Sequence, residues 1–366
     1  MKKKIFFAAL ACVALASCVS ESENLPQENK GQQLSFSAPV MHNQTRHVGE
    51  IEPGQPYPAD ESFTVFGIEH NGDFAGWNAN NVIKNADGSD FFPAAGEVVS
   101  NPEQKGSHWF TTSKDYYLPT EPNYKLTFAA YSPFRAKNDA ESVSYGADGL
   151  VVTDWRMPNE SHYDLMFSKQ STNNKQADIH IAFMHALSSI HVAFAKPQVN
   201  GPASVVVQKV AVKGTAIKNV GTFKDRITAA ADGTAAVWEN LSEDNLPAEY
   251  TIFAGDDFEV PTSTATEPAT ANKRYFMPIP QNLTADIKLI LSYKIKMKAG
   301  DDYEEVKNLE IPFLDFLISE GQKTTAWTKG TRYFYNITFG ALTKIQFHPE
   351  VSDWSTVQNA GTYVIK

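Results

Sequence analysis

The chain has 366 residues, enough for two domains of ordinary size, and its 42% hydrophobic content excludes global disorder. The formal net charge of −10 at pH 7 excludes a role that depends on binding the phosphate backbone of nucleic acids. These figures do not separate an enzyme from a structural or binding protein, so the distinction rests on the elements along the chain.

Residues 1–17 have the pattern of an export signal. MKKK is basic, and IFFAALACVALA is an apolar run too short to cross a bilayer. LASC follows, and its small residues before Cys18 resemble the lipobox of bacterial lipoproteins. The resemblance implies that residues 1–17 are removed and that Cys18 carries a lipid anchor. An ordinary signal peptide cut nearby is the alternative.

Cysteine usage agrees with export. The only other cysteine, Cys12, lies in the segment to be removed, so the mature chain forms no internal disulfide and depends on its core for stability. Residues 19–33 are polar and predict a tether. Glu21 and Glu23 in this tether resemble the acidic signals that send some lipoproteins to the cell surface.

The stretch LSFSAPV, residues 34–40, predicts a strand near the N-terminus. Apolar and polar residues alternate in it, which places one set of side chains on a single inward face. The residues of this set are Leu34, Phe36, Ala38 and Val40. Arg46, the first arginine of the chain, follows shortly after.

Alternation with a period of two dominates the rest of the chain. It predicts strands in FTVFGI (63–68), YKLTFAAY (124–131), SVVVQKVAV (204–212) and RYFYNITF (332–339). The stretch DIKLILSYKIKMK, with its apolar face running from Ile287 to Met297, predicts the first arm of a hairpin that turns at AGDDYEE. Residues 313–322 predict a short helix. Short strands with frequent turns favour antiparallel β-sandwiches.

His185 lies where the alternation changes phase, in HIAFMHALSSIHVAF. A bulge or bend near Ser188 and Ser189 would reconcile the two phases. The pattern places His185 on the apolar face, where a core histidine hydrogen-bonded to a neighbour is favoured over a metal ligand.

The sequence nominates no catalytic residue, metal ligand or cofactor site. It contains no G-x-S-x-G, H-E-x-x-H, P-loop or G-x-G-x-x-G motif, so we expect a protein that is not an enzyme. The acidic clusters DGSD (87–90) and GDDYEE (300–305) are expected to be solvated turns rather than calcium sites. Five aromatic residues could form a sugar platform, although plugs of the sandwich ends are favoured. These residues are Trp77, Trp109, Tyr116, Tyr117 and Trp155.

Several stretches together resemble the fimbrillin family, whose members are lipoprotein precursors of type V pilus subunits on Gram-negative surfaces. They are LASC, LSFSAPVMHNQTR, YYLPTEPNYKLTFAAYSP, YDLMFS, IAFMHALSSIHVAF, NVGTF, RYFMPIPQ and ITFGALTKIQFHPEVSDW. The resemblance implies two tandem transthyretin-like antiparallel β-sandwich domains. On this expectation residues 18–46 are a lipidated tether with a removable strand, residues 47–174 are the N-terminal domain, and residues 175–366 are the C-terminal domain.

The resemblance also implies a route of assembly. An arginine-specific protease would cut between Arg46 and His47 after the lipoprotein machinery has processed Cys18, and the strand at 34–40 would leave. A strand from another pilin subunit would replace it at the cell surface, in a fimbrium on the outer membrane. The candidate donor is the β-prone run at the C-terminus, formed by Thr362, Tyr363, Val364 and Ile365. An ordinary last strand of the second domain is equally compatible with this run, and the role as shaft, tip or anchor is open.

Two further functions stay open at this point. One is a surface glycan-binding lipoprotein that keeps its lipid, and the other is a tip adhesin of the same pilus. The glycan-binding lipoprotein would need Trp and Tyr rings that face solvent and no processing at Arg46.

Overall fold

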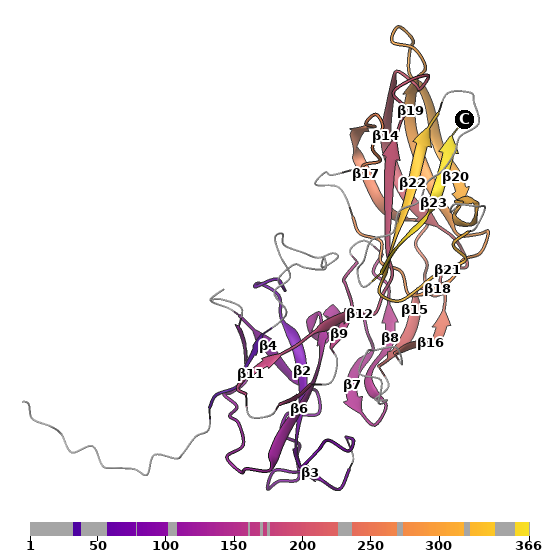
Figure 1. Ribbon diagram of the computed structural model, residues 1–366. Helices are drawn as coiled ribbons and strands as arrows, with labels where there is room; N and C mark the ends of the chain where they lie inside the picture. The colour runs from indigo at the N-terminus through magenta and orange to yellow at the C-terminus, as the bar shows by residue number, and fades with distance from the viewer. Residues whose placement is uncertain are drawn as a thin grey trace, which may run out of the picture.

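The computed structural model describes residues 32–37, 57–77, 79–101, 108–159, 162–168, 171–173, 176–225, 236–268, 274–317, 323–340 and 356–365. Within these ranges every regular element is a β-strand or a 3-10 turn, which confirms the all-β prediction. The strands form an elongated molecule with an N-terminal lobe, a C-terminal lobe and a small sheet between them (Figure 1).

Ten strands make up the N-terminal lobe. Their order is β11-β1-β5-β4-β2-β6-β9-β12, with β3 paired to β2 and β10 paired to β6. The bounds are β1 Ser35–Ser37, β2 Phe63–Asn71, β3 Val82–Ile83, β4 Glu97–Ser100, β5 His108–Thr111, β6 Tyr124–Ser132, β9 Met166–Ser168, β10 Ser171–Asn173, β11 Asp178–His180 and β12 Phe183–His185. The predicted strands at 63–68 and 124–131 are β2 and β6, which pair with each other.

The core of this lobe is rich in aromatic rings. Phe63, Phe92 and Phe128 are buried in it, and so is Trp109. The alternation of β2 and β6 aims Phe63 and Phe128 at the same side of the sheet, where Phe92 and Trp109 join the same core. Burial of large apolar area is therefore the main force that holds the lobe together.

A four-stranded sheet in the order β16-β15-β8-β7 lies between the lobes (Figure 1). Its strands are β7 Ser142–Gly146, β8 Gly149–Arg156, β15 Val220–Lys224 and β16 Val237–Ser242. A 3-10 turn at Phe134–Asn138 precedes it. In this sheet β8 pairs with β15, while β11 and β12 pair with strands of the N-terminal lobe. Strand pairing thus interleaves segments from both sides of residue 174, and the domain division at that residue stays a prediction.

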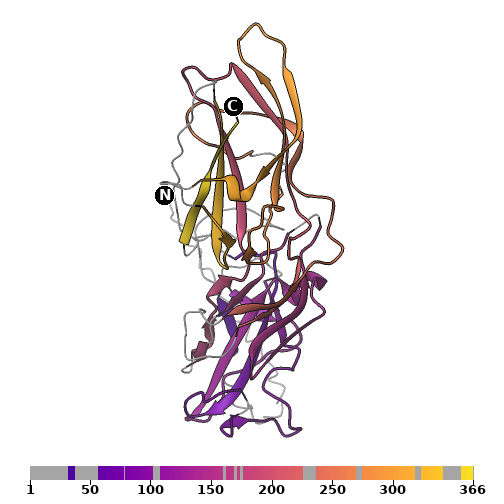
Figure 2. The ribbon, with the colours of Figure 1, turned by 90° about the vertical axis from the view of Figure 1, so that its right-hand side faces the viewer.

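The C-terminal lobe packs one sheet on another. One sheet has the order β17-β14-β19-β20 and the other β13-β22-β23 (Figures 1 and 2). The bounds are β13 Ser189–Ala195, β14 Ser204–Lys213, β17 Tyr250–Glu259, β19 Lys288–Lys296, β20 Glu304–Pro312, β22 Thr331–Phe339 and β23 Thr356–Ile365. A two-stranded ribbon joins β18 Gln281–Asn282 to β21 Ala326–Trp327.

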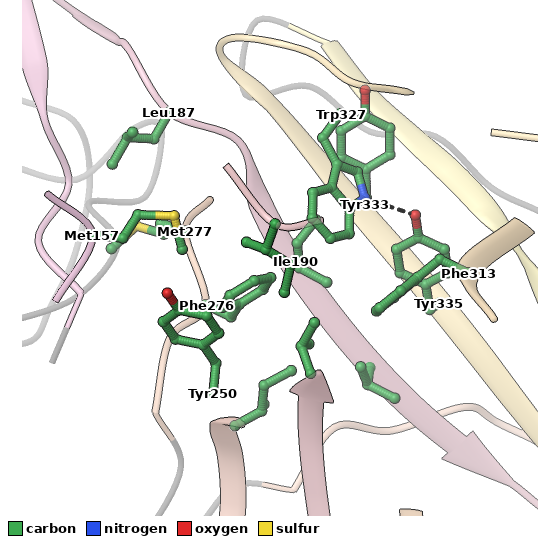
Figure 3. Packing of buried hydrophobic residues seen from close by; sticks show 14 of the residues in the cluster. Met157, Leu187, Ile190, Tyr250, Phe276, Met277, Phe313, Trp327, Tyr333 and Tyr335 are labelled. Carbon is green, nitrogen blue, oxygen red and sulfur yellow. Dashed lines mark hydrogen bonds between the residues drawn. The ribbon is translucent and has the colours of Figure 1, made fainter. Parts of the chain in front are cut away.

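Aromatic residues fill the space between these two sheets. Trp327 and Tyr335 are almost fully buried, and the indole N–H of Trp327 donates a hydrogen bond of 2.9 Å to the Tyr335 hydroxyl (Figure 3). Phe313 packs edge-on against both rings. The one polar hydrogen of the indole therefore has a partner inside the core, as burial requires.

Two local predictions differ from the structure. The helix predicted at 313–322 is a single 3-10 turn, Phe313–Asp315, in the part that the structure describes. Phe313 and Phe316 both enter the core from this turn, and Phe316 already has an extended backbone, so burial of the two rings ends the helical geometry. The predicted hairpin is confirmed as β19 and β20, but Met297, expected to face inward, is 40% exposed because β19 ends one residue earlier.

The phase change near residue 188 also has a structural cause. β12 pairs with β9 in the N-terminal lobe, whereas β13 pairs with β22 in the C-terminal lobe. The chain therefore leaves one sheet and enters another at this point, where a bulge or bend was predicted.

Gly96 occupies a backbone conformation that favours glycine, with φ of +77°. A Cβ atom there would lie 2.5 Å from the Thr64 Cγ2 atom. We expect Gly96→Ala to lower the free energy of unfolding by about 2 kcal/mol or more, because strain and steric overlap add. Gly146→Ala is the matched control, since a Cβ atom there would contact nothing within 4 Å. Urea unfolding should show a lower midpoint for Gly96→Ala only, and equal midpoints would contradict this account.

Candidate functional site

The short strand β1 is inserted between two other strands of the N-terminal lobe. It pairs parallel with β11 on one side and antiparallel with β5 on the other. Backbone hydrogen bonds of 2.8 Å run from the Leu34 N–H to the Tyr116 carbonyl, from the Ser35 N–H to the Ala177 carbonyl, and from the Ile181 N–H to the Ser37 carbonyl. β1 thus closes a gap that would otherwise leave polar backbone groups of both neighbours without partners.

The inward side chains of β1 belong to the core of the lobe. Leu34 is 1% exposed and Phe36 is 0% exposed. The Phe36 ring meets Phe128 edge-on at 5.6 Å and lies 6.4 Å from Phe92 between ring centroids. Two of the four residues predicted for the inward face, Leu34 and Phe36, therefore do point into the core. Ala38 and Val40 lie outside the described residues.

Burial of the two side chains gives the scale of the attachment. At about 1.5–3 kcal/mol for each large apolar side chain, Leu34 and Phe36 contribute about 3–6 kcal/mol gross. The backbone hydrogen bonds add to this. Such an attachment is firm while the strand is part of the same chain, and it is small enough for a competing strand to match.

A buried carboxylate supports the backbone to which β1 is hydrogen-bonded. Glu97 is 4% exposed and accepts hydrogen bonds from the Tyr116 hydroxyl at 2.6 Å and the Ser113 hydroxyl at 2.7 Å. Burial raises the pKa of Tyr116, and the hydrogen bond to Glu97 raises it further. Because the Tyr116 carbonyl receives the Leu34 N–H, Glu97 helps to fix the edge against which β1 lies. The sequence offered no signal for this role.

Two polar side chains meet across the outward face of β1. His108 on β5 and Asp178 on β11 approach to 3.4 Å, and each is about half exposed. A pair so open to water contributes about 1 kcal/mol at most. The inward side chains, rather than this pair, hold β1 in place.

Tyr57 anchors the chain where it re-enters the described structure after β1. It is 5% exposed, its hydroxyl lies 3.0 Å from the Ser132 hydroxyl, and its ring packs edge-on against Phe63 and Trp109. Burial raises the pKa of its phenol. The residues from Tyr57 onward are therefore fixed to the core independently of β1.

The C-terminal strand β23 lies at the edge of a sheet in the other lobe. It runs parallel to β22, from Thr331 opposite Thr356 to Phe339 opposite Ile365 (Figure 1). The residues predicted as a donor strand are its last four. In this chain they therefore lie in the C-terminal lobe, away from β1.

Other predicted sites fall into two groups. Cys18, Arg46 and His47 lie outside the described residues. Among the five aromatic residues considered as a sugar platform, Trp109, Tyr116 and Trp155 are buried, and Trp77 and Tyr117 are only partly exposed. Three of the five rings therefore fill the interior instead of forming a platform.

The predicted core histidine is confirmed. His185 lies with its Nδ1 atom 2.8 Å from a carboxylate oxygen of Asp164, and both side chains are at most 10% exposed. No group of three or more potential metal ligands occurs among the described residues. The acidic cluster at 87–90 is a turn in which Asp87 accepts hydrogen bonds from Ser89.

One set of side chains has the connectivity of a catalytic triad. The Ser189 hydroxyl lies 3.0 Å from His191 Nε2, and His191 Nδ1 lies 2.8 Å from Glu267. Ser189 is 1% exposed and His191 is 5% exposed, and the adjoining cavity has a volume of about 10 Å³. A space that holds about one water molecule cannot admit a substrate, so these groups fasten the loop at Glu267 to β13.

A larger groove, of about 610 Å³, lies on the outer face of β14 and β19. Its charged groups already pair with each other, since Lys209 lies 2.7 Å from Glu249, and Glu310 accepts from both Lys213 and Lys288. Ile290, the apolar exception on this wet face, is buried on the groove floor.

Fold and site together define a two-lobed, all-β protein whose N-terminal lobe is completed by a short strand from near the N-terminus. The model of the fimbrillin-like family matches residues 60–354, and the chain belongs to that family. No curated protein matches the chain. No helix among the described residues is long and apolar enough to cross a membrane.

The chain is similar to solved structures, and the first of them has the same fold. A fimbrial protein from Bacteroides vulgatus is 18% identical, with a TM-score of 0.55, and the match covers 86% of this chain and 97% of that one. An inferred cell adhesion protein from Bacteroides uniformis is 13% identical, with a TM-score of 0.47, and the match covers 88% of this chain and 99% of that one.

Proposed function

We propose that the protein is a subunit of a cell-surface pilus that assembles by strand exchange. In this proposal the chain is exported as a lipoprotein with its lipid on Cys18, reaches the outer membrane, and is cut between Arg46 and His47 by an arginine-specific protease. The released segment carries β1 away, and a strand from another pilin subunit takes its place. Adhesion is the role of the assembled fibre.

The observation that carries the proposal is the position of β1. It supplies two core side chains, yet it lies between two strands that are far away in the sequence. Tyr57 holds the following chain to the core separately. A cut between Arg46 and His47 would therefore detach β1 without loosening the residues after it.

The cut has a physical purpose in this scheme. While the resident strand is tethered, its effective concentration at the site is in the millimolar range or above, and a strand from another molecule competes poorly. Once the tether is cut, a resident strand that dissociates diffuses away, and its concentration at the site falls. The incoming strand then remains because it restores both the apolar contacts and the backbone pairing.

The C-terminal strand is the proposed donor. In its sequence Tyr363 and Ile365 are separated by one residue, as Leu34 and Phe36 are in β1. As an edge strand, β23 has one neighbouring strand to leave, whereas a central strand has two. The tandem domains at 47–174 and 175–366, each with transthyretin-like topology, belong to the same proposal. A glycan-binding lipoprotein is less well supported, because the described aromatic rings are largely buried.

Replacing Arg46 with alanine tests the proposal. We expect Arg46→Ala to reach the cell surface with residues 18–46 still attached and to give no SDS-resistant fibres. The cause would be that β1 cannot be exchanged. The measurement is the intact mass and N-terminal residue of protein isolated from native cell surfaces.

His47→Ala is the control, because it keeps the arginine and should give chains that begin at residue 47 inside fibres. Fibres built from Arg46→Ala chains that still carry Cys18 would contradict strand exchange after cleavage.

A further inference from the structure

The far end of the C-terminal lobe exposes apolar side chains. Among the residues whose burial the structure describes, four large apolar side chains are exposed, and three of them lie in loops at this end. Val199 is 74% exposed, Tyr303 is 42% exposed and Met297 is 40% exposed. We name these three residues the distal patch.

Hydrogen bonds hold the loops of the distal patch together. The Ala203 N–H donates to the Met297 carbonyl at 3.3 Å, which joins the turn that bears Val199 to the β19–β20 hairpin. The Tyr303 hydroxyl lies 2.9 Å from the Ser204 hydroxyl, and the Lys296 ammonium lies 4.3 Å from the centre of the Tyr303 ring. A surface fixed in this way loses little conformational entropy when a partner covers it.

Strand β22, the last strand before β23, ends at this same end of the lobe. Thr338 pairs with Ala195, directly before the turn that bears Val199, and β22 ends at Phe339. Residues 341–366 follow, of which Thr356–Ile365 form β23. If β23 is donated, the 15 residues of the 341–355 segment must span the gap to the recipient, and they reach about 50 Å at most. The recipient site must therefore lie within about 50 Å of the end of β22, the end of the lobe that carries the distal patch.

The fourth exposed apolar side chain lies beside the recipient site. Phe110 is 42% exposed on the outward face of β5, the strand that pairs with β1. Strand donation would thus put the two places where the described surface exposes large apolar side chains within reach of each other.

We propose that the distal patch docks on the N-terminal lobe of a second copy of this chain, against the β5 face that carries Phe110. This inference rests on the proposed strand exchange. Docking raises the effective concentration of the donor strand at the recipient site and so speeds its entry. Burial of the patch also removes apolar surface that a monomer would leave in water.

The first experiment compares fibre growth from cut chains. The test variant carries Val199→Ser, Met297→Ser and Tyr303→Ser. The control carries Lys213→Ser, Lys288→Ser and Glu310→Ser, which change three partly exposed residues near the other end of the β14–β19–β20 sheet. We expect the test variant to assemble at least about tenfold more slowly than the control, while both unfold at the wild-type midpoint. Equal assembly rates would overturn the docking proposal.

Uptake of a synthetic peptide with the sequence of residues 356–366 separates the two proposals. The test variant should bind this peptide at the wild-type rate, because its N-terminal lobe is unchanged. If wild-type cut chains take up no peptide, strand exchange by this segment fails.

Photo-crosslinking tests the docking contact independently of strand exchange. In fibres isolated from cells, a photoreactive phenylalanine in place of Tyr303 should form crosslinks to residues 108–111 of another copy. Crosslinks only to the C-terminal lobe of another copy, or to a different protein, would overturn docking even if the peptide is taken up.

Discussion

Replacing Phe36 with alanine should lower the free energy of unfolding of the N-terminal lobe by about 3–5 kcal/mol. This is the usual cost of removing a fully buried aromatic ring, because the lost apolar contacts and the remaining cavity both contribute. Phe36 is 0% exposed and its ring contacts Phe92 and Phe128. The measurement is urea unfolding of the uncut chain, with hydrogen exchange of β5 and β11 to locate the loss.

Phe110→Ala is the matched control for this prediction. It removes the same ring from the neighbouring strand β5, where the side chain is 42% exposed, and should cost less than about 1 kcal/mol. A cost for Phe36→Ala as small as that of the control would show that β1 does not occupy the core.

The same substitution affects the proposed exchange. In chains cut after Arg46, a loss of about 3 kcal/mol corresponds to roughly 100-fold weaker retention of the released segment. Phe36→Ala chains should therefore lose the segment, and take up a donor peptide, much faster than wild-type chains. Retention at the wild-type rate would show that Phe36 does not hold the segment.

Lowering the pH from 6.5 to 4 should remove about 3 kcal/mol of stability through His162 alone. This side chain is buried between Tyr250 and Phe276, and its Nδ1 atom accepts a hydrogen bond of 2.9 Å from the Met277 N–H. Burial lowers the pKa of His162 from 6.5 to about 4. The unfolded chain therefore binds a proton near pH 6.5 and the folded chain does so only near pH 4. Between these values the unfolded state binds more protons, so the free energy of unfolding falls as the pH falls.

His162→Gln is the control, because its amide oxygen can accept the Met277 N–H but does not titrate in this range. The control matters because burial raises the pKa of Asp139 and Asp225 to about 6, and these groups favour the folded state as the pH falls. The quantity to measure is the difference between the wild-type and His162→Gln stability curves. A difference that stays constant from pH 7 to pH 4 would contradict the account of His162.

Much of the strand content could be predicted from alternation alone. The segments that became β2, β6, β14, β19, β20 and β22 were identified because half-buried strands place apolar residues at every second position. The inward orientation of Leu34 and Phe36 followed from the same pattern and is confirmed. The pattern also placed His185 among apolar residues, where Asp164 is its partner. The family resemblance is likewise confirmed.

Two predictions were wrong where the conformation of a short segment depends on the elements packed around it. The turn at Phe313 was expected to continue as a helix, but two rings that must enter the same core set its geometry. Met297 continued the apolar alternation of β19, yet the strand ends at Lys296 and Met297 is 40% exposed. Alternation shows which side of a strand a residue faces, but not where the core ends.

The sequence by itself determined the class of protein, an all-β chain with an N-terminal strand that has one apolar face. Tertiary structure alone decided that β5 and β11 flank this strand and that Glu97 holds Tyr116 beside it. It also decided that β23 lies parallel to β22 in the other lobe. The physical reason is that side-chain periodicity is local, whereas strand pairing joins residues far apart in the chain. In β1, Ser35 pairs with Asp178 across 143 positions, and no local pattern encodes that partner.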